Sequence, residues 1–330
     1  MSQNFKRRQF ITSAAISSIG LLFLNPVTSF ANVIEQLNVF QKIGLLFYID
    51  SKGKKRQVTT LAEWEIKRKQ IIDGMQQTMG KRPEFSNLPG MNISIIDELK
   101  EENYTRLNIS FTVAQNETVS AYLYVPFQKG IPKKFPDFKT DRYHSGTMKA
   151  IFDNMRCVDL LQARQDVDPN RIGGVIGHSL GGHNAIFTGA FDKRLKVIVS
   201  SCGWTLMDYY NAGKVVTEKY GGSLCPWAQE RYMPLLREKY HFDVKKIPFD
   251  FDEVIAAIAP RAFFSNSPLN DSNFGVAGVK KDIAEVSELY RFLEAKDKLE
   301  VCYSKSQHDF APEVRFEVFG FIDKILKLNS

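Results

Sequence analysis

A short glycine-rich motif, Gly177-His178-Ser179-Leu180-Gly181, has the spacing expected around a nucleophilic serine. An apolar stretch, 173–177, precedes Ser179 and predicts a strand, and residues 183–190 after it predict a helix. A serine at such a strand–turn–helix junction presents its hydroxyl above the edge of a sheet. The start of the helix places backbone N–H groups, that of Leu180 first, where an oxyanion develops. The pattern therefore predicts that Ser179 is a nucleophile and Leu180 N–H an oxyanion donor.

A serine nucleophile needs a base to take its proton, and the chain has five histidines. His308 follows the last predicted strand, 299–303, and precedes the C-terminal helix, where a base can reach the carboxyl ends of the strands. His178, next to the nucleophile, is predicted to line the substrate pocket. We therefore expect His308 to be the base.

The base in turn needs an orienting carboxylate, and Asp271 follows the predicted strand 262–266. It is the one carboxylate between Glu253 and Asp282. Asp309 adjoins His308 and is poorly placed to reach its Nδ1, so we expect it to fix the loop. Ser179, His308 and Asp271 are thus predicted to act as nucleophile, base and orienting carboxylate, in the chain order Ser179, Asp271, His308.

The hydrophobic pattern indicates an α/β protein with a mostly parallel sheet. A capping box at Thr60-Leu-Ala-Glu63 begins a helix in an N-terminal helical extension. Period-two alternation then predicts antiparallel strands at 93–98, 107–113 and 119–127. From residue 145 onward strands alternate with helices, as in a parallel sheet covered on both faces. The expected helices are 145–164, 183–190, 254–258, 276–295 and 314–328, and the expected strands are 173–177, 195–200, 262–266 and 299–303.

The segment 171–183, Arg-Ile-Gly-Gly-Val-Ile-Gly-His-Ser-Leu-Gly-Gly-His, resembles the nucleophile turn of the α/β-hydrolase superfamily. Its pattern is similar to that of dienelactone-hydrolase-like and acetyl-xylan-esterase-like proteins. Asn270-Asp271 and Gln307-His308 resemble the acid and base loops. The resemblance covers about 91–330 and implies an α/β-hydrolase fold with serine esterase activity. It also implies hydrolysis through an acyl-enzyme, without a metal or an organic cofactor.

One part of the pattern is missing. α/β-Hydrolases take a second oxyanion donor from a loop that is followed by a further helix and strand. Residues 128–144 hold no apolar strand run and are too few for a strand–helix–strand element, which needs about 30 residues. Three explanations stay open: an internal deletion, a natural degenerate relative, or a substitute strand from 43–49.

The N-terminal residues 1–31 resemble a twin-arginine export signal. Arg7-Arg8-Gln-Phe-Ile is followed by a mainly apolar stretch, 11–24, and by small residues before a cleavage point at Ala31. The segment predicts an interaction with the export machinery and a periplasmic or secreted mature chain that is not bound to a membrane. The expected organisation is a signal at 1–31, the helical extension at 32–90, and the hydrolase domain at 91–330.

Charge gives little support to nucleic-acid binding. Three of the 44 basic residues and no acid lie in 1–31, so the net charge falls from +7 to +4 without them. The densest basic cluster, 52–56, is predicted to be a solvated turn.

A cap-like insertion, 203–250, is rich in aromatic residues. Trp204 and Trp227 are candidates for lining a sugar-sized pocket, with core packing as the alternative. The four cysteines are expected to be free thiols, with one bridge, Cys202–Cys225, as the alternative.

These features together predict an exported serine esterase acting on a carboxylic ester, with a carbohydrate acyl ester as one candidate substrate. A peptidase of the same fold is the first alternative. The second is a non-catalytic relative that keeps the three triad residues but lacks the oxyanion site. Reactivity of Ser179 separates the second alternative from the two enzymes.

Overall fold

The computed structural model describes residues 43–84, 86–100, 105–125, 142–165, 167–168 and 173–327. They belong to one unit by their mutual contacts, Phe40–Ser330. The predicted export signal, 1–31, lies outside the described residues. None of the helices within the described residues is both long and apolar enough to cross a membrane.

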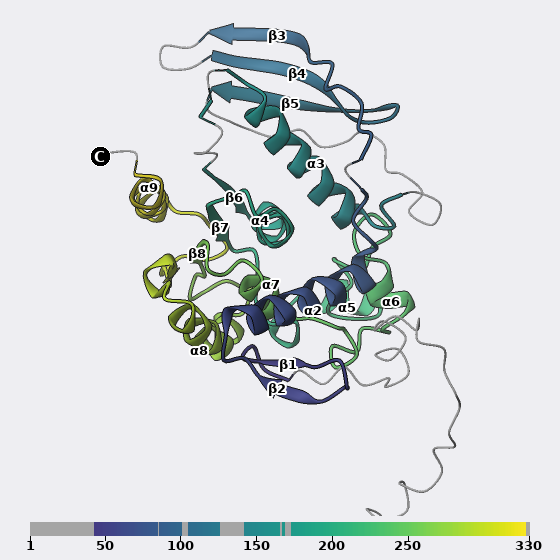
Figure 1. The fold of residues 1–330 in the computed structure, drawn as a ribbon, viewed down its shortest axis with the longest axis vertical. Coiled ribbons are helices and arrows are strands. Elements are labelled where there is room, and N and C mark those ends of the chain that lie inside the picture. Colours follow the sequence, from purple (N-terminus) through teal and green to yellow (C-terminus); the bar gives the residue numbers. More distant parts are fainter. Residues whose placement is uncertain are drawn as a thin grey trace, which may run out of the picture. The chain divides into compact units, whose positions relative to one another are not determined.

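The predicted strands and helices occur in the expected order (Figure 1). The strands are β1 (Phe47–Ile49), β2 (Lys55–Gln57), β3 (Ser94–Lys100), β4 (Thr105–Ala114), β5 (Glu117–Val125), β6 (Gly174–His178), β7 (Val197–Ser201), β8 (Ala262–Asn266) and β9 (Leu299–Cys302). The helices are α2 (Leu61–Met79), α3 (Gly146–Gln162), α4 (Leu180–Phe191), α5 (Lys214–Tyr220), α6 (Leu235–Glu238), α7 (Phe251–Ala256), α8 (Val276–Phe292) and α9 (Pro312–Leu326). Two 3₁₀ turns complete the set, η2 (Met207–Tyr209) and η3 (Lys296–Lys298). Among these elements, β1, β2, α5 and α6 were not predicted.

The four strands β6, β7, β8 and β9 form a parallel sheet in that order. Side chains of β7 alternate between its two faces. Ile198 faces α4, where it lies against Gly189. Val197 and Val199 belong to the second apolar cluster, together with α9 residues such as Val318. Helices therefore cover both faces, and β7 and β8 are buried along their whole length, as the continuous apolar runs predict.

The predicted antiparallel strands are also confirmed. β3, β4 and β5 form a three-stranded meander. Alternate residues of β4, namely Ile109, Phe111 and Val113, are fully buried in the main core. The error-free alternation of this segment in the sequence reflects that one buried face.

Helix α2 begins as its capping box predicts. The Thr60 side chain accepts a hydrogen bond from the Glu63 amide, and Glu63 in turn accepts from the Thr60 amide. The helix buries Trp64, Ile71 and Met75 in the same core as α3, α4 and α7. The described part of the predicted extension is thus packed, through α2, into the main core of this unit.

The segment 43–49 does not supply a substitute strand to the parallel sheet. Only Phe47–Ile49 is a strand, and it pairs antiparallel with β2 in a separate two-stranded hairpin. The basic cluster 52–56 contains the exposed turn of this hairpin and part of β2. The hairpin was not predicted, because strands of three residues are too short to show a period.

The structure describes only residues 142–144 of the short stretch 128–144. Within the described residues, β6 pairs with β7 alone, and its other side is an edge of the parallel sheet. Ile176 on this strand is 42% exposed. Residues 126–141 lie outside the described part of the chain, so the missing strand–helix–strand element stays a prediction.

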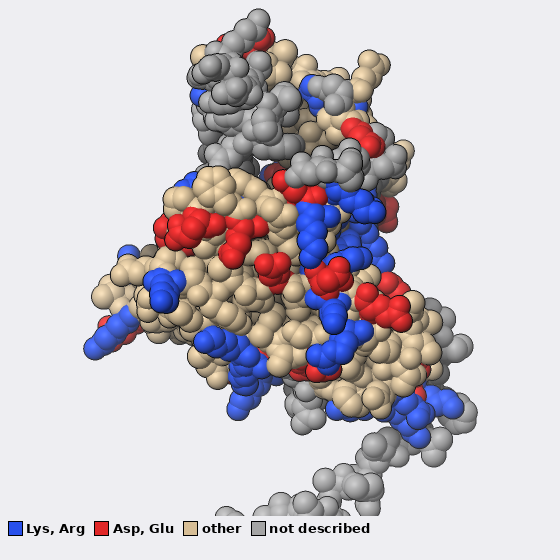
Figure 2. Space-filling view, turned by 90° about the vertical axis from the view of Figure 1, so that its left-hand side faces the viewer, with Lys and Arg blue, Asp and Glu red and all other residues tan. Residues whose placement is uncertain are grey.

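Figure 2 shows one face of the molecule, on which basic and acidic side chains are interspersed. Mixed charge of this kind is typical of an ordinary solvated surface.

Candidate active site

The turn after β6 holds Ser179 in a backbone conformation that few non-glycine residues adopt, with φ 54° and ψ −120°. Its amide donates to the carbonyl of Ser201 on β7, 2.8 Å away, which ties the turn to the sheet. A Cβ on Gly177 would lie 2.1 Å from the backbone of Gly181, so the turn closes only if residue 177 is glycine. The strand, the tight turn and helix α4 therefore fix where the Ser179 hydroxyl points.

The structure brings together the three residues predicted to form the triad. His308 Nε2 lies 2.8 Å from Ser179 Oγ, and His308 Nδ1 lies 2.9 Å from Asp271 Oδ2. The first distance is within the range in which a proton passes from a nucleophile to its base, and the second is that of a hydrogen bond that orients the base. The imidazole thus bridges the hydroxyl and the carboxylate.

Asp271 is held in place by its own loop. Its Oδ1 accepts hydrogen bonds from the amides of Asn273 and Phe274, at 2.9 and 3.0 Å. Its side chain is fully buried, whereas that of His308 is 28% exposed. The ring of Phe274 stacks on the His308 imidazole, with centroids 5.7 Å apart. The carboxylate is fixed, and the histidine remains accessible to substrate on one side.

His178, predicted to line the pocket, lies beside the base. Its ring centroid is 5.1 Å from that of His308, and its ring stacks on Phe310. Its Nδ1 lies 3.1 Å from Ser201 Oγ. Partial burial, and then the neighbouring His308, lower the pKa of His178, which favours the neutral imidazole.

Leu180 is the first residue of α4, so its N–H is not consumed by the hydrogen bonds of the helix. The Ser179 side chain makes no capping bond that would compete for this end of the helix. The amide is therefore free to serve as the predicted oxyanion donor. The second donor implied by the family resemblance would lie before α3, where residues 126–141 are outside the described part of the chain.

Cys202 is a neighbour of the triad that was not singled out as a site residue. It follows β7 directly, and its Sγ, the carboxylate of Asp271 and a ring nitrogen of His308 lie within 4.8 Å of one another. Burial, and then the charge of Asp271, raise the pKa of the Cys202 thiol to about 12. Its place after a predicted parallel strand is the signal that could have identified it.

The loop that carries His308 is anchored to the sheet by Asn266 at the end of β8. The Asn266 amide donates to Ser201 Oγ at 2.9 Å and to the Asp309 carbonyl at 3.0 Å. The Asp309 carboxylate accepts from the Phe310 amide. Asp309 thus fixes the loop, as predicted, and does not contact the base nitrogen that Asp271 occupies.

The two tryptophans proposed for the pocket lie in the interior. Trp204 is 1% exposed, and its indole N–H donates to Ser265 Oγ at 2.8 Å. Trp227 is 5% exposed, and its ring stacks with those of His183 and Tyr210. Both tryptophans are therefore core residues, which was the alternative prediction for them. Their hydrophobicity alone could not separate a pocket wall from a core.

All four cysteines are free thiols, so the Cys202–Cys225 bridge is absent. Both residues are buried, and hydrogen bonds to the carbonyls of Asp309 and Val216 engage their sulfurs separately.

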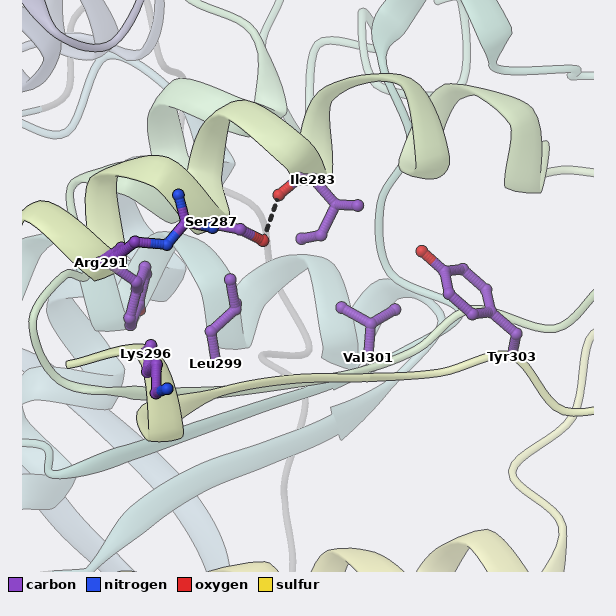
Figure 3. Close-up of a pocket in the computed structure, with 8 residues that line it drawn as sticks. Ile283, Ser287, Arg291, Lys296, Leu299, Val301 and Tyr303 are labelled. Atoms are coloured by element: carbon purple, nitrogen blue, oxygen red, sulfur yellow. Dashed lines mark hydrogen bonds between the residues drawn. The ribbon is translucent and has the colours of Figure 1, made fainter.

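A cavity of about 310 Å³ lies away from the triad, between α8 and β9 (Figure 3). In Figure 3, Ser287 donates to the Ile283 carbonyl of its own helix, and Tyr303 lies at the opposite end of the lining from Lys296. No residue of the triad lines it. Its lining residues are Ile283, Ser287, Tyr290, Arg291, Lys296, Leu299, Val301 and Tyr303.

A parallel sheet whose strands β6, β8 and β9 are followed by a serine in a strained turn, an aspartate and a histidine is typical of the α/β-hydrolase fold. The fold is similar to that of solved carbohydrate esterases. A family 15 carbohydrate esterase, a glucuronoyl esterase from Caldicellulosiruptor kristjansonii, superposes with a TM-score of 0.64 at 16% identity, covering 87% of this chain and 91% of the other. The glucuronoyl esterase catalytic domain of Hypocrea jecorina gives 0.60 at 17% identity, covering 87% and 89%.

Sequence comparisons point the same way. A family model described as fungal glucuronyl esterase matches residues 135–289. A putative hydrolase, YtaP, of Bacillus subtilis is 32% identical over 176 residues, 53% of each chain. The carbohydrate esterase MZ0003 of an unknown prokaryotic organism is 28% identical over 130 residues, 38% of this chain and 28% of the other. The matched part thus spans about half of the first of these curated relatives and less of the second.

Proposed function

We propose that this chain is a serine carboxylic ester hydrolase that acts on a carbohydrate ester. The observation that carries the proposal is the position of His308, within hydrogen-bond distance of both Ser179 and Asp271. The similar proteins are named as glucuronoyl and carbohydrate esterases, which supports an ester of a sugar acid or of a sugar as the substrate class.

The geometry supports a two-step reaction. His308 Nε2 takes the Ser179 proton as the hydroxyl oxygen attacks the ester carbonyl, and Asp271 stabilises the imidazolium through Nδ1–H. The Leu180 N–H, at the positive end of α4, stabilises the tetrahedral oxyanion. His308 then protonates the leaving alcohol. A water molecule, deprotonated by the same histidine, releases the acid and restores Ser179.

The test uses the full-length protein beside Ser179→Ala. Both are exposed to a fluorophosphonate probe and to three substrates: a chromogenic phenyl acetate, the methyl ester of glucuronic acid, and a peptide anilide. We expect labelling and ester turnover that disappear in Ser179→Ala. A folded protein that is neither labelled nor active would overturn the proposal, and turnover of the anilide alone would indicate a peptidase instead.

We further propose that the protein is exported by the twin-arginine route. The arginine pair at 7–8, followed by the apolar stretch 11–24, supports this. A fusion to a reporter that is active only after folded export tests it. Export should be lost when Arg7 and Arg8 are both changed to Lys, and export that survives the double change would contradict the route.

A further inference from the structure

The ends of the four parallel strands each present one reactive side chain. Ser179 follows β6, Cys202 follows β7, and the loops after β8 and β9 carry Asp271 and His308. Because the carboxyl ends of parallel strands meet at one edge of a sheet, the four side chains gather there. Three of the four are used in the proposed hydrolysis. Cys202 has no role in it.

Cys202, Asp271 and His308 bring three different kinds of ligand atom close to one another. A thiol sulfur, a carboxylate oxygen and an imidazole nitrogen lie within 4.8 Å of one another. Sulfur, nitrogen and oxygen at bond lengths of about 2.0–2.3 Å are the ligands of tetrahedral zinc, and ligand atoms around such an ion are about 3.5 Å apart. The His308 Nδ1 and Asp271 Oδ2 atoms, 2.9 Å apart across a hydrogen bond, need to separate by only about half an ångström.

We propose that this cluster is an inhibitory site for a thiophilic divalent cation, Zn²⁺ or Cd²⁺, which switches the hydrolase off by occupying its acid and base. The metal takes Cys202 Sγ, Asp271 Oδ2 and His308 Nδ1, with water as the fourth ligand. The thiol proton and the Nδ1 proton leave to solvent as the two metal bonds form. A hard cation such as Mg²⁺, which prefers oxygen ligands in an octahedron, does not fit this set.

Inhibition follows from the same atoms that serve the proposed hydrolysis. With the metal on Nδ1, Asp271 no longer stabilises a proton on that nitrogen, so the imidazole cannot become the imidazolium that the reaction requires. The His308 side chain is 28% exposed, so an ion can approach the site from solvent at the imidazole, whereas the Asp271 side chain is fully buried. A triad without a neighbouring thiol would bind a metal only through its histidine. Cys202 is therefore the residue on which the proposed site depends.

The effect on turnover rests on the proposed function, but the metal site itself does not. Full-length wild type, Cys202→Ser and Cys202→Ala are titrated with Zn²⁺, and each residual ester hydrolysis rate is compared with the metal-free rate of the same variant. Cys157→Ser is the matched control, because Cys157 is a free thiol on α3, outside the cluster. A parallel titration with Cd²⁺ follows the ultraviolet absorption of the thiolate–cadmium bond, which needs no activity.

We expect Zn²⁺ to inhibit wild type and Cys157→Ser at the same concentration, reversibly with a chelator, and Mg²⁺ to have no effect. Both Cys202 variants should need at least about tenfold more Zn²⁺, since even outer-shell partners of a metal contribute that much to affinity. The Cd²⁺ absorption should fall in both Cys202 variants by one thiolate per chain. Equal inhibition with and without Cys202, or wild type that Zn²⁺ does not inhibit, would overturn the proposal.

The two proposals fail differently. If the chain hydrolyses no ester, the Cd²⁺ absorption still tests the cluster. If the chain is an active esterase that Zn²⁺ leaves untouched, the hydrolase assignment stands and the metal site does not.

Discussion

Lys67 on α2 and Glu253 on α7 form an ion pair with 2.9 Å between Nζ and Oε1, across 186 residues of sequence. Both side chains are almost completely buried, at 4% and 6% exposure. The pair joins the helix before the antiparallel sheet to the helix that precedes β8. It therefore couples α2 to the part of the domain that carries Asp271.

Replacing Lys67 by Met should cost about 3–5 kcal/mol of unfolding free energy, because it leaves the Glu253 carboxylate buried without a partner. Chemical denaturation monitored by circular dichroism measures this. Lys69→Met is the control, because Lys69 is 74% exposed in its pair with Asp73 and should change stability by less than about 0.5 kcal/mol. Changing Lys67 and Glu253 together to Met and Leu should recover most of the loss. A double variant no more stable than Lys67→Met would contradict the pairing.

Asp271→Asn should lower kcat on the order of 10⁴-fold while leaving the fold intact. The Asn oxygen can still accept from the amides of Asn273 and Phe274, but its NH₂ group would face His308 Nδ1 and favour the wrong tautomer. Steady-state kinetics on an ester substrate measure the effect. Asp309→Asn is the matched control, because it retains the acceptor for Phe310, and it should stay within a few-fold of wild type. Comparable losses in both variants would argue against Asp271 as the orienting acid.

Gly177→Ala should destabilise the protein by about 1–3 kcal/mol and reduce labelling of Ser179, because the new methyl group meets the backbone of Gly181 at 2.1 Å. Thermal unfolding and fluorophosphonate labelling report the two effects. Gly320→Ala, in α9, is the control: nothing lies within 4 Å of the added carbon, and helix propensity favours Ala by up to about 1 kcal/mol. Equal stability of the two variants would show that the turn tolerates a side chain.

Glu63→Gln should flatten the acid dependence of stability. Hydrogen bonds from Thr59, then from Thr60, lower the pKa of Glu63 from 4.5 to about 2. Since the folded pKa is the lower one, the charged carboxylate stabilises the fold fully above pH 4.5, and this contribution is lost as the pH falls toward 2. Unfolding followed between pH 6 and pH 2 should show a shallower slope for the variant. An unchanged slope would place the acid sensitivity elsewhere.

The triad residues were easier to predict from the sequence than the residues that line the substrate pocket. Ser179, Asp271 and His308 each follow an apolar strand, and the order of strands in a parallel sheet brings their ends together whatever the loops do. Trp204 and Trp227 lie in irregular chain, where no period shows which face is buried, so their interior positions were not predictable. The position of Cys202 near the triad could have been predicted in the same way, because it comes just after the predicted strand 195–200.

The helices and strands also differ in how well the sequence predicts them. α2 was predictable from a capping box and a long apolar face, both of which are local. The hairpin of β1 and β2, with three residues in each strand, has no such signal, and its pairing depends on packing against α2. The short helices α5 and α6 in the insertion 203–250 also lack a signal, because α5 buries no residue and α6 buries Leu236 alone, so neither has an apolar face that shows a period.

The backbone of Ser179 carries a further consequence. A residue with a side chain held at φ 54° and ψ −120° costs on the order of 1–3 kcal/mol, and glycine would relieve much of that. The fold would thus be more stable if the residue expected to attack the ester were replaced by glycine. Selection of this chain for heat resistance alone would favour loss of its nucleophile, so any screen for hardier variants has to demand turnover at the same time.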